Sequence, residues 1–160
     1  MAIPITDSQN TNVYLVATTV ATTTAAQIKT AITGAKQIGC LQNLGDITTS
    51  RTVTEYKCLS SNESAKSLGS ISLPSVPIEL LFNAADVTGQ AELRTMYSTN
   101  TRRKVIIALN DQITPTTGNP TYIVFEGGLS SDGESITLDH AVLYKTTIEL
   151  CSTPELTKAT

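Results

Sequence analysis

Four side chains of this sequence are of the kinds that bind metal ions or act as nucleophiles, but their spacing favours neither chemistry. Histidine occurs once, as His140, and cysteine three times, as Cys40, Cys58 and Cys151. A zinc site with three cysteines and one histidine normally has close-paired ligands, which these are not. His140 is in register with the apolar positions of an alternating segment, so we expect a packed, hydrogen-bonded core histidine. Three cysteines without a CxxC spacing predict buried, reduced thiols.

Two short motifs invite a chemical interpretation, and each has a simpler one. The segment GGLSSDG, residues 127–133, lacks the GxSxG of a nucleophile elbow and the Gly-Lys-Ser/Thr of a phosphate loop. We expect it to form the hairpin turn between the last two strands. The basic run 102–104 predicts a solvated strand start, with contact to phosphate or to an acidic neighbouring subunit as the alternative. Because the acidic residues are scattered and no spacing fixes a carboxylate pair, we expect no enzyme activity, no catalytic residue, no metal and no cofactor.

The composition predicts one domain with an aliphatic core. The chain has 160 residues, of which 40% are hydrophobic, 4% are aromatic and none is Trp. Only 16% are charged and the net charge is −3, whereas proteins that bind nucleic acid through phosphate contacts usually carry a basic excess. No apolar run approaches the ~20 residues that cross a bilayer. The first residues lack the pattern of a signal peptide, so we expect synthesis and folding in the cytoplasm.

The first third of the sequence predicts a strand, a short helix and two further strands. Residues 12–20 favour a strand. Thr24 and Gln27 form a capping-box pattern before a helix at about 25–33, and Gly34 suits its end. The segments 36–41 and 51–58 then predict two strands joined by a turn.

The next segment, residues 59–75, is polar, rich in serine and without periodicity. A loop this long in a compact domain is usually functional or disordered. We therefore expect a flexible excursion that becomes ordered on assembly. The candidate assembly residues are Ser60, Asn62, Glu63, Lys66 and Ser70.

The second half predicts strands separated by one helix. Alternation predicts strands at 76–82, at 103–109, which is apolar on both faces, at 122–125 and at 136–150. The last of these strands has fifteen residues, which is longer than most strands. We therefore expect it to bend, to contain a bulge or to project beyond the sheet. A helix at 88–99 is expected to begin at Thr88, to place Glu92 near its positive end and to stop at Asn100. Its single apolar stripe predicts that it covers one flank of the sheet.

The order of these elements resembles that of the major tail proteins, or tail tube proteins, of long-tailed, siphovirus-type bacteriophages. The similarity covers about Lys36 to Ser152 and rests on the joint order of short motifs. These are the upstream run IGCLQNLGDITTSRTVTEYKCL, the strand ending in Phe82-Asn83, the helix opening Gly89-Gln90 with Leu93, the strand Val105-Ile106-Ile107, and Phe125-Glu126-Gly127 leading to Ser130-Ser131 in a turn.

The resemblance implies a mainly β fold, a β-sandwich or partly closed barrel flanked by a short α-helix. It implies a single tail-tube domain over 1–160, with an N-terminal arm and short helix at 1–35, an assembly loop at 59–75 and a C-terminal tail at 152–160. Such proteins form hexameric rings whose strands join into an inner β-barrel, and the rings stack into a tube that conducts DNA. The strands at 103–109 and 136–150 are our candidates for shared structure between copies, since unpaired sheet edges favour pairing with another chain.

The resemblance also implies partners and a location. The expected partners are other copies of the chain, a tape-measure protein, a tail terminator, baseplate or tail-tip proteins, and DNA passing without tight binding; no membrane is involved. The expected location is the tail of the virion. A channel that releases DNA should not neutralise its phosphates, so our candidate channel-lining acids are Glu79, Asp139 and Glu149, with an outer-surface position as the alternative for each.

Mainly β chains of this size have three other functions that serve as alternatives here. A carbohydrate-binding or adhesin module needs exposed aromatic side chains, and this sequence has five Tyr, two Phe and no Trp. A tube protein of a contractile tail or of a secretion system has a related fold. A small hydrolase needs a catalytic constellation that the sequence lacks. Rings or tubes in electron micrographs favour a tube protein, and a glycan-binding monomer favours the module.

Overall fold

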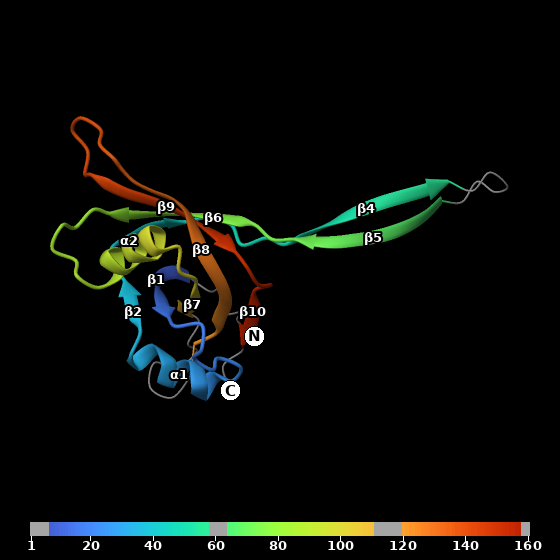
Figure 1. Ribbon diagram of the computed structural model, residues 1–160, viewed down its shortest axis with the longest axis horizontal. Helices are drawn as coiled ribbons and strands as arrows, with labels where there is room; N and C mark the ends of the chain where they lie inside the picture. The colour runs from blue at the N-terminus through green and yellow to red at the C-terminus, as the bar shows by residue number, and fades with distance from the viewer. Residues whose placement is uncertain (1–6, 58–63, 111–119, 158–160) are drawn as a thin grey trace, which may run out of the picture.

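The computed structural model describes residues 7–57, 64–110 and 120–157, with side chains described from residue 11 onward. Within these ranges the chain forms two helices and ten strands, most of which belong to one curved sheet (Figure 1). In chain order the elements are β1 (Asp7–Val16), α1 (Ala25–Thr33), β2 (Lys36–Ile38), β3 (Leu41–Leu44), β4 (Ser50–Lys57), β5 (Ser64–Ser72), β6 (Ser75–Leu81), α2 (Gly89–Thr99), β7 (Arg103–Asn110), β8 (Tyr122–Ser135), β9 (Leu143–Leu150) and β10 (Glu155–Thr157).

The sheet has the strand order β2-β1-β7-β8-β9-β6-β3, and its pairings are antiparallel. The first half of β8 pairs with β7 up to Gly127, and its second half pairs with β9 as far as Ser135. β8 therefore forms the corner at which the sheet folds into two layers. A Cβ at Gly127 would lie 2.5 Å from Cγ2 of Ile148, so the close approach of β8 and β9 at this corner requires glycine.

The main core lies between the two layers and is closed by α2. Its residues come from both layers and from the helix. Those with an exposed fraction of 1% or less are Val13, Val76, Ile78, Leu80, Leu93, Met96, Val105, Ile107, Tyr144 and Ile148. A second core lies on the other face of β7, where Ile106 and Val124 pack with Ile28 of α1. The prediction that this strand is apolar on both faces is confirmed, because Val105 to Ala108 are all buried.

Both helices were predictable from their ends. Thr24 accepts a hydrogen bond from the Gln27 N–H, and the Gln27 side chain accepts one from the Thr24 N–H, which confirms the capping box of α1. At α2 the residue Asn100 has φ 49° and ends the helix as expected. Thr88 precedes α2 but makes no side-chain cap. Asp86 caps the helix instead. Its carboxylate accepts hydrogen bonds from three backbone N–H groups, those of residues 88, 89 and 90.

The predicted strand at 136–150 is wrong in its first half. β9 begins only at Leu143, and residues 136–142 form the turn between β8 and β9. In that turn Asp139 has φ 62°, which reverses the chain, and the N–H of His140 donates to the carbonyl of Thr137 at 3.3 Å. The alternation of apolar residues continues into an exposed turn. His140 is therefore exposed, and its expected place in the core is wrong.

Residues 127–133 do not form the expected hairpin turn, because they lie within β8. Ser130 and Ser131 are therefore strand residues, and their expected place in a turn is wrong. The predicted strand at 36–41 is interrupted by Cys40, whose φ of 57° separates β2 from β3. Cys40 and Cys151 are free and exposed, so the expectation of buried thiols is wrong for both. Cys58 lies outside the described residues.

The expected irregular loop at 59–75 is wrong for residues 64–72, which form β5 paired with β4. The strand was not recognisable because none of its residues is buried, so its sequence carries no alternation of buried and exposed positions. Lys66 and Ser70 lie in β5, and Ser60, Asn62 and Glu63 lie outside the described residues. In the C-terminal segment, Glu155–Thr157 forms β10 on the edge of β8. Neither helix in the described ranges has the length and apolar character to cross a membrane.

Candidate functional site: a polar sheet face, two free edges and an exposed hairpin

One layer of the sandwich has a polar face directed away from the core. β6 and β9 are paired along their lengths, and their residues alternate between the two faces. The core face of this pair carries Ile78, Leu80, Tyr144 and Ile148 among its buried residues. The opposite face carries Ser75, Pro77, Glu79, Lys145, Thr147 and Glu149, all exposed or half-buried. We call this second face the polar face.

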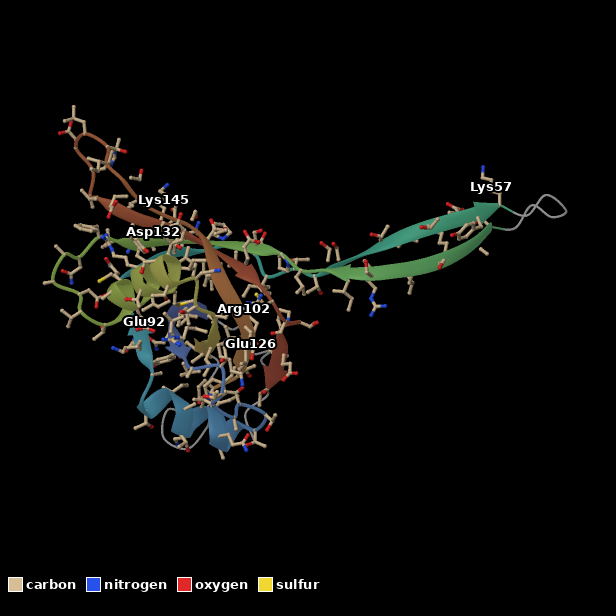
Figure 2. The ribbon with its side chains drawn as sticks, in the orientation of Figure 1. Lys57, Glu92, Arg102, Glu126, Asp132 and Lys145 are labelled. Carbon is tan, nitrogen blue, oxygen red and sulfur yellow. The ribbon has the colours of Figure 1, made fainter. Side chains whose placement is uncertain are left out.

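Glu79 and Lys145 form an ion pair on the polar face. They are opposite each other in the register of β6 and β9, and Nζ of Lys145 lies 2.7 Å from Oε1 of Glu79. Both side chains are partly exposed, so the pair contributes little to stability. Its main effect is to neutralise the ammonium group, which leaves Lys145 (Figure 2) poorly able to hold a phosphate.

Glu149 is held on the same face by two serine hydroxyls. Ser75 Oγ donates to one carboxylate oxygen at 2.6 Å, and Ser130 Oγ donates to the other at 2.7 Å. Because hydrogen bonds to a carboxylate favour its charged form, the bonds from Ser75 and then Ser130 lower the pKa of Glu149. No ion pair to it occurs among the described residues. Glu149 thus supplies an uncompensated negative charge.

The three candidate acids do not lie together. Glu79 and Glu149 are on the polar face, whereas Asp139 lies in the exposed turn 136–142, before the start of β9. Ser75, Ser130 and Lys145 belong to the same arrangement but were not candidates in the sequence. Alternation placed Lys145 on the polar side of its strand, but no local pattern indicated which residues of β6 and β8 it would meet.

The other side of this layer is fixed to α2 by a cluster around Arg94. The Arg94 guanidinium lies 5.6 Å from the ring centroid of Phe82 and 5.2 Å from that of Tyr144, and it forms an ion pair with Glu134. The hydroxyl of Tyr144 donates to Asp132. Burial, followed by the contact with Asp132, raises the pKa of Tyr144, so this hydroxyl keeps its proton. Asp132 and Lys145 are labelled in Figure 2.

Two edges of the same layer have no strand partner among the described residues. β3 pairs with β6 on one side only. The second half of β8, residues 128–135, pairs with β9 on one side, while β7 leaves β8 at Gly127. The layer β3-β6-β9-β8 therefore ends in two open edges, and open edges favour pairing with another chain.

The hairpin of β4 and β5 extends away from the sandwich, and every described residue in it is exposed (Figure 1). In its register Val53 is opposite Leu68 and Arg51 is opposite Ile71, with a register shift between the two pairs. Because residues 51 and 53 are two apart in β4, Val53, Leu68 and Ile71 lie on one side of the hairpin. These three exposed side chains form what we call the hairpin stripe. An isolated two-stranded hairpin is marginally stable in water, so the stripe needs contacts that the described part of its own chain does not provide.

Comparisons with known proteins identify the fold. No family model and no curated protein matches the sequence. Solved structures do match: the SPP1 tail tube aligns with a TM-score of 0.68 and 13% identity over 96% of this chain and 80% of that one. A chain from the sheath/tube terminator of an extracellular contractile injection system, PVC, aligns at 0.70 and 10% identity over 98% of both chains. A chain from the tail of an empty GTA particle, refined with C6 symmetry, aligns at 0.65 and 11% identity over 96% of this chain and 99% of that one.

These similarities establish that the chain has the fold found in tail tubes. The expectation of a mainly β, tail-tube-like sandwich flanked by a helix is confirmed. The sheet of the single chain is folded into two layers and is not a closed barrel.

Proposed function

We propose that this protein is the structural subunit of a tail tube, in which copies join edge to edge into hexameric rings and the rings stack into a conduit for DNA. The observation that carries this proposal is the layer β3-β6-β9-β8 with its two free edges. The location that follows is the tail of a phage or of a related particle, and the role is structural.

The directions of the two free edges favour ring closure. Each neighbouring pair in β3-β6-β9-β8 is antiparallel, and with four strands the two outer ones run in opposite directions. When β3 of one copy is placed beside β8 of the next, the new pair is also antiparallel, which is a favourable pairing. Repeating this head-to-tail contact around an axis closes the sheet and removes every edge of the layer. The C6 symmetry used for the GTA tail supports six copies.

In such a ring the polar face lines the channel, because the core and α2 cover the other face of the layer. Of its three charged residues, Glu79 and Lys145 neutralise each other and Glu149 remains, which gives two negative charges and one positive, or −1 for each copy. Among the described residues of β6 and β9 on this face, the one cation, Lys145, is already paired, so these strands do not retain DNA through counterion release. We therefore propose channel-lining roles for Glu79 and Glu149.

The ends of the tube require other proteins. The structural neighbours come from a tube terminator, a terminating cap and a baseplate as well as from tubes. We propose a tail terminator and baseplate or tail-tip proteins as partners of the end rings, and a tape-measure protein as the occupant of the channel before DNA passes.

The rival function of a carbohydrate-binding module is not favoured. In the described part of the chain the large exposed aromatic side chains are Tyr56, Phe82 and Tyr97. Tyr56 lies on β4, Phe82 on the loop after β6 and Tyr97 on α2, so they form no common platform for a sugar ring.

The assembly claim is tested by concentrating the purified protein and examining it by sedimentation and negative-stain electron microscopy. We expect rings or hollow tubes in equilibrium with free subunits. A strict monomer at every concentration, above all one that binds a glycan array, would contradict the proposal.

The lining claim is tested with tubes of the Glu149→Lys variant, whose polar face changes from −1 to +1 for each copy. We expect these tubes to bind duplex DNA in a salt-dependent way, whereas wild-type tubes do not. The matched control is Glu155→Lys, which makes the same charge change at an exposed site on β10. Equal DNA binding by both variants would place Glu149 outside the channel.

A further inference from the structure

Two exposed apolar surfaces lie at opposite ends of the layer β3-β6-β9-β8. One is the hairpin stripe, in which Val53, Leu68 and Ile71 are 53%, 65% and 41% exposed. The other is the turn 136–142, in which Ile136 is 79% and Leu138 is 87% exposed. Neither surface is covered by the described part of its own chain. Clustered exposed apolar side chains of this kind mark sites of protein contact.

The course of β6 fixes the two surfaces at opposite ends. β6 begins at Ser75, directly after the hairpin, and ends at Leu81, which is opposite Leu143 at the start of β9. The N–H of Phe82 donates to the carbonyl of Val142 at 2.9 Å, which places the end of β6 beside the turn. In Figure 1 the hairpin extends to the right and the turn to the upper left. A single chain cannot bring the two together, but copies stacked in the same orientation can.

The charges at the two ends are complementary. In the sequence the hairpin segment 50–72 carries three basic residues, Arg51, Lys57 and Lys66, and two acidic residues, Glu55 and Glu63, a net charge of +1. Figure 2 shows Lys57 at the far end of β4. At the other end, the turn 136–142 and the loop 82–88 contain Asp139 and Asp86 and no Lys or Arg, a net charge of −2. Opposite charges of this kind steer association and fix its orientation.

We propose that the turn 136–142 is the receptor for the hairpin of a second copy of this chain in the next ring. The hairpin stripe packs on Ile136 and Leu138, and Asp139 lies near the basic residues of the hairpin. This inference rests on the proposed tube function and assigns Asp139 to the contact between rings and not to the channel.

Another apolar surface competes for the hairpin. A cavity of about 820 Å³ lies between α1 and β1, lined by small and apolar residues that include Ala26 and Ala31. Its charged residues are Lys36, Glu92 and Arg103, and Glu92 is paired with Arg103 at 2.7 Å. The remaining charge is positive, which disfavours a hairpin of net positive charge.

Disulfide cross-linking in assembled tubes tests the choice of receptor. The variant Leu68→Cys/Leu138→Cys is made in a background with serine at the three native cysteines, and its tubes are oxidised. Because every copy then carries one hairpin thiol and one turn thiol, we expect a ladder of dimers, trimers and longer chains on a non-reducing gel. The matched control is Leu68→Cys/Ala26→Cys, which places the second thiol in the cavity beside α1 and is expected to give no ladder.

A second variant leaves the native cysteines in place. Ile136→Ser/Leu138→Ser changes only exposed side chains, so the free subunit is expected to keep its circular dichroism and its unfolding midpoint. Its critical concentration for tube formation is expected to rise about tenfold or more, because two apolar contacts are lost at each ring interface. Leu156→Ser, at an exposed position of β10, should leave the critical concentration unchanged.

The outcomes separate this inference from the proposed function. Wild-type protein that forms neither rings nor tubes removes both. If wild-type protein forms tubes and the variant Ile136→Ser/Leu138→Ser assembles equally well, the receptor assignment is wrong and the tube function stands. The same conclusion follows if only the variant with Ala26→Cys gives a cross-linked ladder.

Discussion

The two-layered sandwich and the β4–β5 hairpin are both β-structure, yet different interactions hold them together. In the sandwich, β7 has four consecutive buried residues and each layer covers the other. In the hairpin all the described residues are exposed, and the two strands are joined only to each other. Burial of apolar area stabilises the sandwich within one chain, whereas none of the described residues of the hairpin strands is buried. The difference separates the part of the molecule that folds within one chain from the part for which we propose contacts with other copies.

The largest effect expected from this comparison comes from one substitution made in each region. Ile107 is 1% exposed in β7, and Ile71 is 41% exposed in β5. Ile107→Ala should lower the free energy of unfolding by about 2–5 kcal/mol, since it removes a buried side chain and leaves a cavity. Ile71→Ala should change it by no more than about 0.5 kcal/mol in the free subunit. Urea unfolding measures both values, and equal losses would show that the hairpin is part of the folded core.

The next effect concerns the corner where the layers meet. Gly127→Ala brings a Cβ to 2.5 Å from Ile148 Cγ2 and 3.0 Å from the Glu149 carbonyl oxygen. Overpacking of this kind should cost about 1–3 kcal/mol in unfolding free energy. Gly133→Ala, in the same strand, has no atom within 4 Å of the added Cβ and should be nearly neutral. A neutral Gly127→Ala in urea unfolding would mean that the corner is looser than the structure shows.

A smaller effect is expected at the start of α2, the helix that covers the sandwich. Asp86→Ala removes the carboxylate that caps three N–H groups and should cost about 1 kcal/mol at pH 7. Partial burial raises the pKa of Asp86, but the hydrogen bonds from residues 88, 90 and 89 outweigh it and lower the pKa. The folded pKa thus lies below the unfolded one, so this stabilisation is present above about pH 4 and is lost as the pH falls through the folded pKa.

Unfolding measured at several pH values checks this prediction. The difference in stability between wild type and Asp86→Ala should shrink below about pH 4. The exposed Asp46 serves as the control, since Asp46→Ala removes a carboxylate that caps no helix. A difference that stays constant down to pH 2 would show that the carboxylate is not the cap.

The smallest predicted effect is on the polar face. The double variant Ser75→Ala/Ser130→Ala removes both donors to Glu149, so its carboxyl pKa should return to the ordinary value of about 4.3. Nuclear magnetic resonance titration of the side-chain carbon measures the pKa in wild type and variant. Identical values would mean that the hydroxyls do not hold the carboxylate in the free subunit.

The sequence alone predicted those elements whose sequence pattern is local. The capping residues around α1 and the end of α2 at Asn100 were predictable from a few neighbouring residues, because caps satisfy backbone groups within one helical turn. The alternation of β6 and the uninterrupted apolar run of β7 likewise reflect burial on one and on two faces. This alternation also places Glu79 and Glu149 on a polar strand face, as the structure does.

The other parts of the fold and of the candidate site depend on contacts between residues distant in the sequence, so the sequence alone did not predict them. β5 has no buried position, so only its pairing with β4 defines it as a strand. Ile136 and Leu138 continue the period of β9, but the sequence does not show whether a partner covers them, and in the single chain none of the described residues does. The corner at Gly127 depends on the approach of Ile148, about twenty residues away in the chain. These are the regions in which the proposed function and the receptor assignment lie.

The most direct test of the central claim is a helical cryo-electron microscopy reconstruction of the assembled protein. The account predicts that β3 of each copy runs antiparallel to residues 128–135 of the next, so that the four-stranded layers form one continuous barrel with Glu149 facing its interior. A reconstruction in which these two edges are separated, or in which the polar face lies on the outside of the assembly, would contradict it.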